Sequence, residues 1–141
     1  MSSPQNFPND ADLAVSDILY FDNYAVFMRR DRIIQVHIKD DFACEVEDSQ
    51  NILNCIEKLS KGKKYPLLVI YSDFNTFSKE ATALVAKHKL TKADALVINN
   101  NFALKLLGKF FLRVNKPIRP TRIFDDVDSA LGWLKTFYNK N

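Results

Sequence analysis

The feature that most constrains the fold is a continuous apolar run, Leu67–Tyr71, which follows Tyr65-Pro66 and ends at Ser72-Asp73. A strand with one wet face alternates apolar and polar residues, whereas a continuous run is typical of a central strand buried on both faces. Such strands occur in parallel sheets whose faces are covered by helices. The run therefore predicts an α/β domain.

The rest of the chain supplies the other elements of such a domain. Alternation predicts an opening hairpin with strands over 23–30 and 33–38. Apolar spacing and capping residues predict helices over 45–61, 79–89 and 102–114, a closing helix with its apolar stripe from Val127 to Tyr138, and short strands over 93–98 and 121–124. The order β-β-α-β-α-β-α-β-α predicts a mostly parallel sheet of about five strands with an antiparallel opening hairpin, flanked by four helices. Whether the helices cover one face or both stays open.

Length and composition indicate one globular domain. The chain has 141 residues, of which 47% are hydrophobic, and we expect a polar, partly ordered tail over 1–16 before a single domain over 17–141. No apolar run is long enough to span a membrane and no export signal is recognisable, so we expect a cytoplasmic protein. Cys44 and Cys55 are too few for a disulfide framework and lack zinc-site spacing. We therefore expect neither a metal nor a cofactor.

Charge is divided unevenly along the chain. Residues 1–60 carry a net −6 and residues 61–141 a net +9, which together give the overall +3. Such a division could favour head-to-tail self-association or an anionic partner, and ordinary solvated surface is the simpler interpretation.

Two stretches carry a family resemblance. The order of elements, and the strand Leu67–Tyr71 that continues through Ser72–Phe77 into a helix opened by Ser78, resemble STAS (SpoIIAA-like) domains. The stretch from Gly108 to Leu134 resembles a functionally uncharacterised bacterial group of STAS-like proteins, and the likeness covers residues 20–138. The resemblance implies an interaction module. It places Phe77-Ser78-Lys79-Glu80 where that family has a phosphorylatable Asp-Ser-Ser-Gly motif, of which one serine is retained.

Ser78 is the sharpest single candidate. A serine at this point caps the helix that follows, which explains its presence without any further role. A phosphate on Ser78 would lie at the positive end of the helix dipole beside Lys79, so a phosphorylation switch is electrostatically feasible. Thr76 is the second candidate acceptor.

Cations and apolar residues gather toward the end of the chain. Candidate anion contacts, near a helix C-terminus and the loop after it, are Arg113, Lys116, Arg119 and Arg122. Helix dipole complementation explains part of this cluster, and because glycines and aromatics are not interleaved with it we do not expect a nucleic-acid partner. The apolar residues of 102–114 spread over about 200° of the helix, wider than one packing face needs. Leu104, Phe110 and Phe111 are therefore candidate contacts to a pocket or to another subunit.

No arrangement of residues points to catalysis. His37 and His88 have no nucleophile at a recognisable spacing, and three glycines exclude a glycine-rich phosphate loop. Asp73 follows the buried strand but has no acidic partner. We therefore expect a non-enzymatic regulatory module that docks a protein partner around Asp73–Glu80, contacts it through Asp73, Phe74, Phe77 and Lys79, and forms homodimers. The alternative is a carrier of a small apolar or lipid-like ligand in a pocket beside 102–114.

Overall fold

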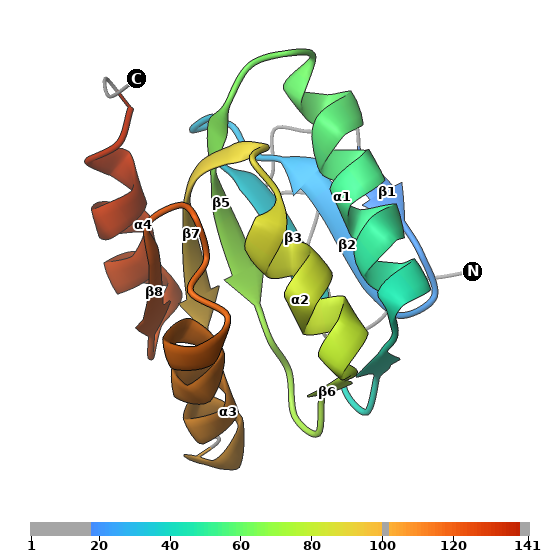
Figure 1. Ribbon diagram of the computed structural model, residues 1–141. Coiled ribbons are helices and arrows are strands. Elements are labelled where there is room, and N and C mark those ends of the chain that lie inside the picture. The colour runs from blue at the N-terminus through green and yellow to red at the C-terminus, as the bar shows by residue number, and fades with distance from the viewer. Residues whose placement is uncertain (1–17, 100–101, 139–141) are drawn as a thin grey trace.

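One mixed sheet of six strands organises the part of the chain that the computed structural model describes, residues 18–99 and 102–138 (Figure 1). Its order is β1-β2-β3-β5-β7-β8, with β1 and β2 antiparallel to their neighbours and β3, β5, β7 and β8 parallel. The strands are β1 Ile18–Tyr20, β2 Tyr24–Met28, β3 Ile34–Ile38, β5 Tyr65–Ile70, β7 Thr91–Val97 and β8 Thr121–Phe124. The predicted α/β class, the hairpin and the parallel strands are confirmed, and β1 extends the hairpin by one short edge strand.

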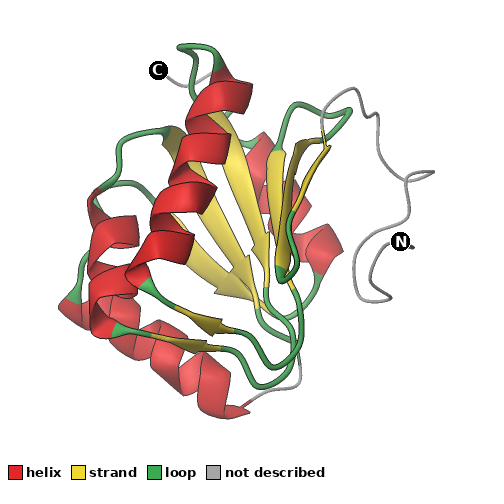
Figure 2. Ribbon diagram, turned by 90° about the vertical axis from the view of Figure 1, so that its right-hand side faces the viewer, coloured by secondary structure: helices red, strands yellow, loops and turns green. Residues whose placement is uncertain are grey.

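Helices cover both faces of this sheet. They are α1 Val46–Ser60, α2 Lys79–Lys87, α3 Phe102–Val114 and α4 Val127–Lys135. The first three helices each connect one parallel strand to the next in the order β3, β5, β7, β8. Because every connection runs in the same direction along the sheet, right-handed crossovers place these helices on one face. The last follows the edge strand β8 and returns across the opposite face, as the two views show (Figures 1 and 2). None of the described helices has the length and apolar character needed to cross a membrane.

The central strand β5 shows why its sequence is continuously apolar. Leu67 and Val69 belong to the core under α1 and α2, whereas Leu68 belongs to a second core under α4. Side chains alternate along a strand, so burial on both faces requires apolar residues at successive positions. The inference drawn from Leu67–Tyr71 is therefore confirmed by the packing.

A second, two-stranded sheet positions the loop after β5. The strands β4 Ala43–Cys44 and β6 Thr76–Phe77 pair in parallel. Within the same loop the Asn75 side chain accepts from the Ser72 N–H at 2.8 Å and donates to the Lys39 carbonyl at 2.8 Å. The segment that leads into α2 is therefore held by defined hydrogen bonds, which a sequence pattern of two-residue strands does not reveal.

Candidate functional site

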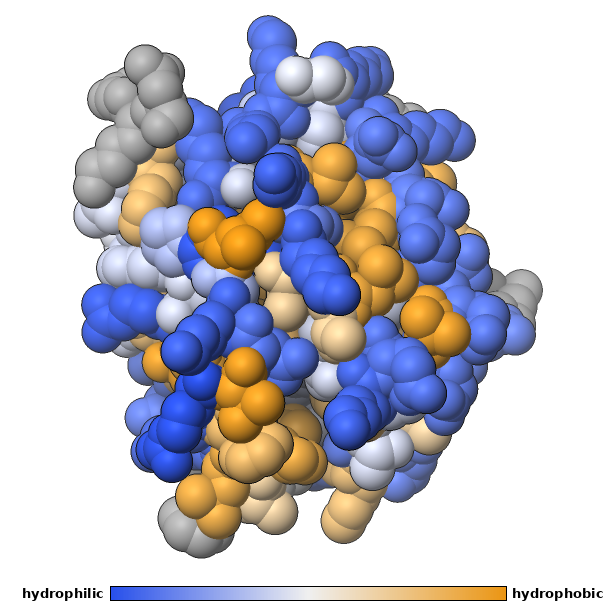
Figure 3. All heavy atoms as spheres, in the orientation of Figure 1, coloured by the Kyte–Doolittle hydropathy of each residue, from blue (hydrophilic) through white to orange (hydrophobic). Residues whose placement is uncertain are grey.

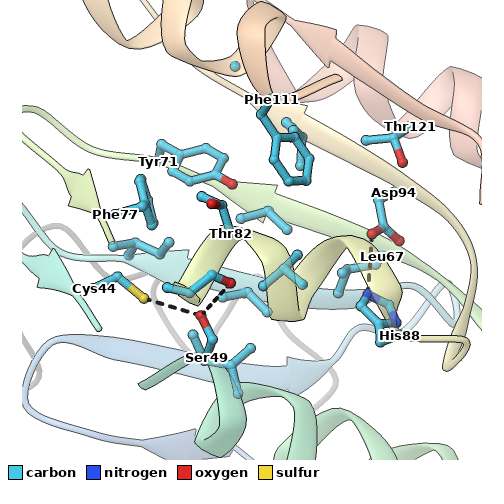
Figure 4. Close-up of a pocket in the computed structure, with 18 of the residues that line it drawn as sticks. Cys44, Ser49, Leu67, Tyr71, Phe77, Thr82, His88, Asp94, Phe111 and Thr121 are labelled. Carbon is cyan, nitrogen blue, oxygen red and sulfur yellow. Dashed lines mark hydrogen bonds and ion pairs between the residues drawn. The ribbon is translucent and has the colours of Figure 1, made fainter. Parts of the chain in front are cut away.

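A cavity of about 140 Å³ lies between the sheet and the three helices of one face (Figure 4). Its floor comes from β3, β5 and β7, and its walls come from α1, α2 and α3. Most of its lining is apolar and includes Val36, Leu67, Leu96, Leu104, Leu107 and Phe111.

Short side chains on the neighbouring helices explain why space remains there. On α2 the cavity meets Ala81, Thr82 and Val85, none of which reaches far from the helix. Gly108 brings α3 close to the sheet, since a Cβ at that position would stand 2.9 Å from Ile123 Cδ1. The helix is therefore held near β8 at this glycine, while the space toward α2 stays open.

Tyr71 places one polar group in this mainly apolar space. Its ring packs edge-on against Phe77, with 5.3 Å between centroids, and its hydroxyl points into the cavity (Figure 4). Burial raises the pKa of the Tyr71 phenol, so the group stays a neutral O–H at physiological pH. Among the described residues the hydroxyl has no hydrogen-bond partner, which leaves it available to a ligand.

A buried ion pair borders the cavity on its other side. Arg119 Nε donates to Asp94 Oδ2 at 2.6 Å, and the Thr91 hydroxyl donates to Asp94 Oδ1 at 2.5 Å. Burial alone would raise the pKa of Asp94, but the interactions with His88, Arg119 and Thr91 outweigh it, and the net shift is downward. Asp94 therefore stays ionised inside the fold.

Arg119 also closes the C-terminal end of α2. Its guanidinium donates to the carbonyls of Val85 at 2.9 Å, Ala86 at 3.1 Å and His88 at 3.2 Å. These are carbonyls that a helix end leaves without an internal partner. The prediction of Arg119 as an anion contact is wrong, because its guanidinium is buried and already binds Asp94 and three carbonyl oxygens.

The side chains of His88 and Cys44 are also buried within the fold. The Nδ1 atom of His88 accepts from the Leu90 N–H at 3.2 Å, so the ring proton belongs on Nε2, which lies 3.5 Å from Asp94 Oδ2. Burial raises the pKa of the Cys44 thiol to about 11, so it is protonated at neutral pH. Neither group is presented as a free base or nucleophile. Within residues 18–99 and 102–138, no group of His, Cys, Asp and Glu is arranged to hold a metal.

The residues predicted as contacts around Asp73–Glu80 lie in different environments and do not form one site. Ser78 caps α2, because its Oγ accepts from the Ala81 N–H at 3.1 Å, which bears out its capping role. Phe77 lines the cavity, whereas Asp73, Thr76 and Lys79 are exposed. Phe74 is 74% exposed with a φ of 60°, a left-handed conformation that is uncommon for an aromatic residue.

The residues predicted on 102–114 also separate. Leu104 is 5% exposed and lines the cavity together with Phe111, whereas Phe110 is 60% exposed and lies outside it. Phe110 is therefore no part of the pocket predicted beside this helix, because it points to the outer side of α3. Arg113 and Lys116 are exposed, and Arg122 lies over the Phe124 and Trp133 rings at 5.2 and 5.7 Å.

Sequence reasoning missed Tyr71 and Asp94 as site residues. The sequence predicts Tyr71 only as the end of an apolar strand. Asp94 did carry a signal, since a lone carboxylate within a strand of alanines, Leu96 and Val97 needs a buried partner. The identity of that partner depends on how β7, α2 and the segment before β8 meet in space.

The fold and the cavity together define an α/β domain whose mixed sheet is covered on both faces and encloses an apolar pocket on one. A family model described as a domain of unknown function, DUF7793, matches residues 27–138, and the chain belongs to this family. The chain is also similar to a crystal structure of a protein with unknown function from Arthrobacter sp. FB24, at 21% identity and a TM-score of 0.29, over 79% of this chain and 92% of that one. The comparison with curated proteins gives no match.

Proposed function

We propose that this domain binds a small, mainly apolar ligand in the cavity beside α3 and acts by binding rather than by catalysis. The observation that carries the proposal is the Tyr71 hydroxyl, which faces a mainly apolar cavity without a hydrogen-bond partner among the described residues. Ligand sites typically combine an apolar lining with a few such polar groups, which orient the ligand. The ligand would place one polar atom against Tyr71.

The volume limits the size of this ligand. A cavity of about 140 Å³ is close to an engineered protein cavity of about 150 Å³ that takes up benzene, and smaller than the roughly 300–1,000 Å³ of drug-sized sites. A single aromatic ring or a short acyl chain therefore fits. A longer ligand would have to displace α3, which forms the outer wall.

The charged side chains at the cavity support binding without chemistry. The carboxylate of Asp94 is held by Arg119 and Thr91, and the guanidinium of Arg119 by Asp94 and three carbonyls. General acid–base catalysis needs a group that can reach the substrate and exchange a proton with it. Because these groups already bind one another and the backbone, we expect them to form a rigid polar border of the cavity rather than to exchange protons with a ligand.

Phenol and toluene, which are similar in size, test this proposal when titrated into the protein and followed by ¹H–¹⁵N NMR. We expect both probes to shift amides around the cavity, and phenol to bind more tightly because its hydroxyl pairs with Tyr71. Tyr71→Phe should weaken phenol binding about fivefold, since one hydrogen bond contributes about 1 kcal/mol, and leave toluene binding little changed. Equal losses for both probes would show that Tyr71 does not select the polar atom.

A filled cavity provides the matched control. Val85→Phe places a ring in the cavity, whereas Ala83→Phe places one on the same helix outside the lining. We expect Val85→Phe to abolish binding of both probes and Ala83→Phe to retain it. No amide shifts in the wild type, or unchanged binding by Val85→Phe, would refute a ligand site here.

A second candidate is protein docking through the loop before α2. It is supported by Phe74, which is 74% exposed in a left-handed conformation on a loop held by the Asn75 hydrogen bonds. Affinity capture with the wild type and Phe74→Ser as baits tests it. Proteins recovered only by the wild type support docking at this loop, and identical recoveries contradict it.

A further inference from the structure

The outer side of α3 exposes large apolar side chains, and one of them, Leu107, also lines the cavity. We call them the α3 apolar face, and each is more than half exposed: Leu106, Leu107, Phe110, Val114 and, in the loop just after the helix, Ile118. In Figure 3 apolar atoms gather over α3 and the adjoining side of α2. Solvent contact of this extent on neighbouring residues is characteristic of an interaction surface rather than of isolated exposed residues.

Helix geometry separates this face from the cavity side. At 3.6 residues per turn, the helical members from Leu106 to Val114 fall within about 100° of the circumference. Leu104 and Phe111 lie beyond this arc and turn toward the cavity, which Phe111 visibly enters (Figure 4). The helix therefore presents apolar side chains on two sides, of which only one is used by the fold.

Cations border the face and acids are absent from its sequence. Lys109, Arg113 and Lys116 are exposed and form no ion pair with any described residue, whereas Lys105 pairs with Asp125. The sequence between positions 102 and 124 contains no Asp or Glu. An apolar helix face flanked by unpaired cations is the pattern of a helix that lies in the surface of an anionic membrane.

We propose that the α3 apolar face docks this protein onto an anionic lipid surface, with Phe110 and its neighbours in the headgroup region and Lys109, Arg113 and Lys116 against lipid phosphates. The charge favours this occupant over a second copy of the chain. A two-fold contact through the same face would bring its own cations together, and lysine is depleted from protein interfaces. Membrane docking does not depend on the cavity ligand, so each proposal can fail separately.

The acidic end of the fold limits how the protein would lie. The loops beside β4 and β6 carry Asp40, Asp41 and Asp73, all exposed. An anionic surface repels these carboxylates while it attracts the cations of α3. The contact with lipid would therefore be confined to α3 and its following loop and would exclude the loops around β4 and β6.

Vesicle flotation tests the proposal with the full chain. One set of vesicles is pure phosphatidylcholine, and the other is an equimolar mixture of phosphatidylcholine and phosphatidylglycerol. We expect binding to the mixed vesicles only, and weaker binding as salt rises. The triple variant Lys109→Gln, Arg113→Gln, Lys116→Gln should lower partitioning about 100-fold, because each basic residue near such a surface contributes about fivefold.

Matched variants keep the test specific to α3. Lys58→Gln, Lys63→Gln, Lys64→Gln removes the same charge from exposed positions elsewhere and should leave binding nearly unchanged. Phe110→Ser should weaken binding about tenfold or more, whereas Phe74→Ser should not. No flotation with mixed vesicles, or equal losses in the two triple variants, would overturn membrane docking. Phe110-dependent dimerisation in sedimentation velocity without vesicle binding would assign the face to a second copy instead.

Discussion

At the scale of single residues, the buried pair of Asp94 and Arg119 connects three parts of the fold. The carboxylate belongs to β7, the guanidinium precedes β8, and the carbonyls that Arg119 also binds end α2. Removing one member of a buried pair leaves the other charge without compensation, which costs more than the pair contributes. A single substitution in this pair should therefore destabilise the packing of β7, β8 and α2 together.

We expect Arg119→Met to lower the free energy of unfolding by about 3–5 kcal/mol, because the buried Asp94 carboxylate loses its guanidinium partner. The double variant Asp94→Leu, Arg119→Met should lose less than Arg119→Met alone, since no buried charge remains. Urea unfolding at neutral pH measures both values. If the double variant is the less stable of the two, the remaining contacts of Asp94 with Thr91 and His88 contribute more than its uncompensated charge costs.

The stability of the protein in acid should also depend on this pair. The pKa of Asp94 is lower in the folded protein than its ordinary value, so its ionisation stabilises the fold above the unfolded-state pKa of about 3.9. This contribution is lost as the pH falls below about 3.9 toward the folded-state pKa. The stability difference between the wild type and Asp94→Asn should therefore shrink over that acidic range and stay constant near neutral pH.

At the scale of elements, the sequence predicts those with a long enough pattern. The helix expected over 102–114 is α3, and the buried run at Leu67–Tyr71 is β5 with its following residue. The strands β4 and β6 are two residues each, too short to show a period, and their pairing follows from the contact between distant loops. The position of α4 was also open, because a helix that follows an edge strand can return on either face.

Element packing also explains why the site was only partly predictable. The excess of apolar residues on 102–114 is visible in sequence, but its division into a cavity side with Leu104 and Phe111 and an outer side with Phe110 depends on how α3 sits on the sheet. Gly108 sets that position through its approach to Ile123. A glycine within a helical pattern gives no indication of which residue it approaches.

At the scale of the whole molecule, the described elements differ in how firmly they are held. The central strands β5 and β7 are buried under helices on both faces. Helix α3 buries Leu104 and leaves much of its remaining side-chain surface to solvent. Local stability follows such differences in burial, and segments that move for ligand entry are drawn from the less stable end.

Native-state hydrogen exchange should therefore separate α3 from the sheet. We expect amides of β5 and β7 to exchange only through global unfolding, and amides of α3 to exchange through a local opening of lower free energy that exposes the cavity. Phenol binds only the closed cavity, so saturating phenol raises the free energy of the local opening. Exchange of the α3 amides should slow by the corresponding factor. Equal protection of α3 and β5 without phenol would show that α3 opens only with the whole fold, and a ligand would then have to enter by another path.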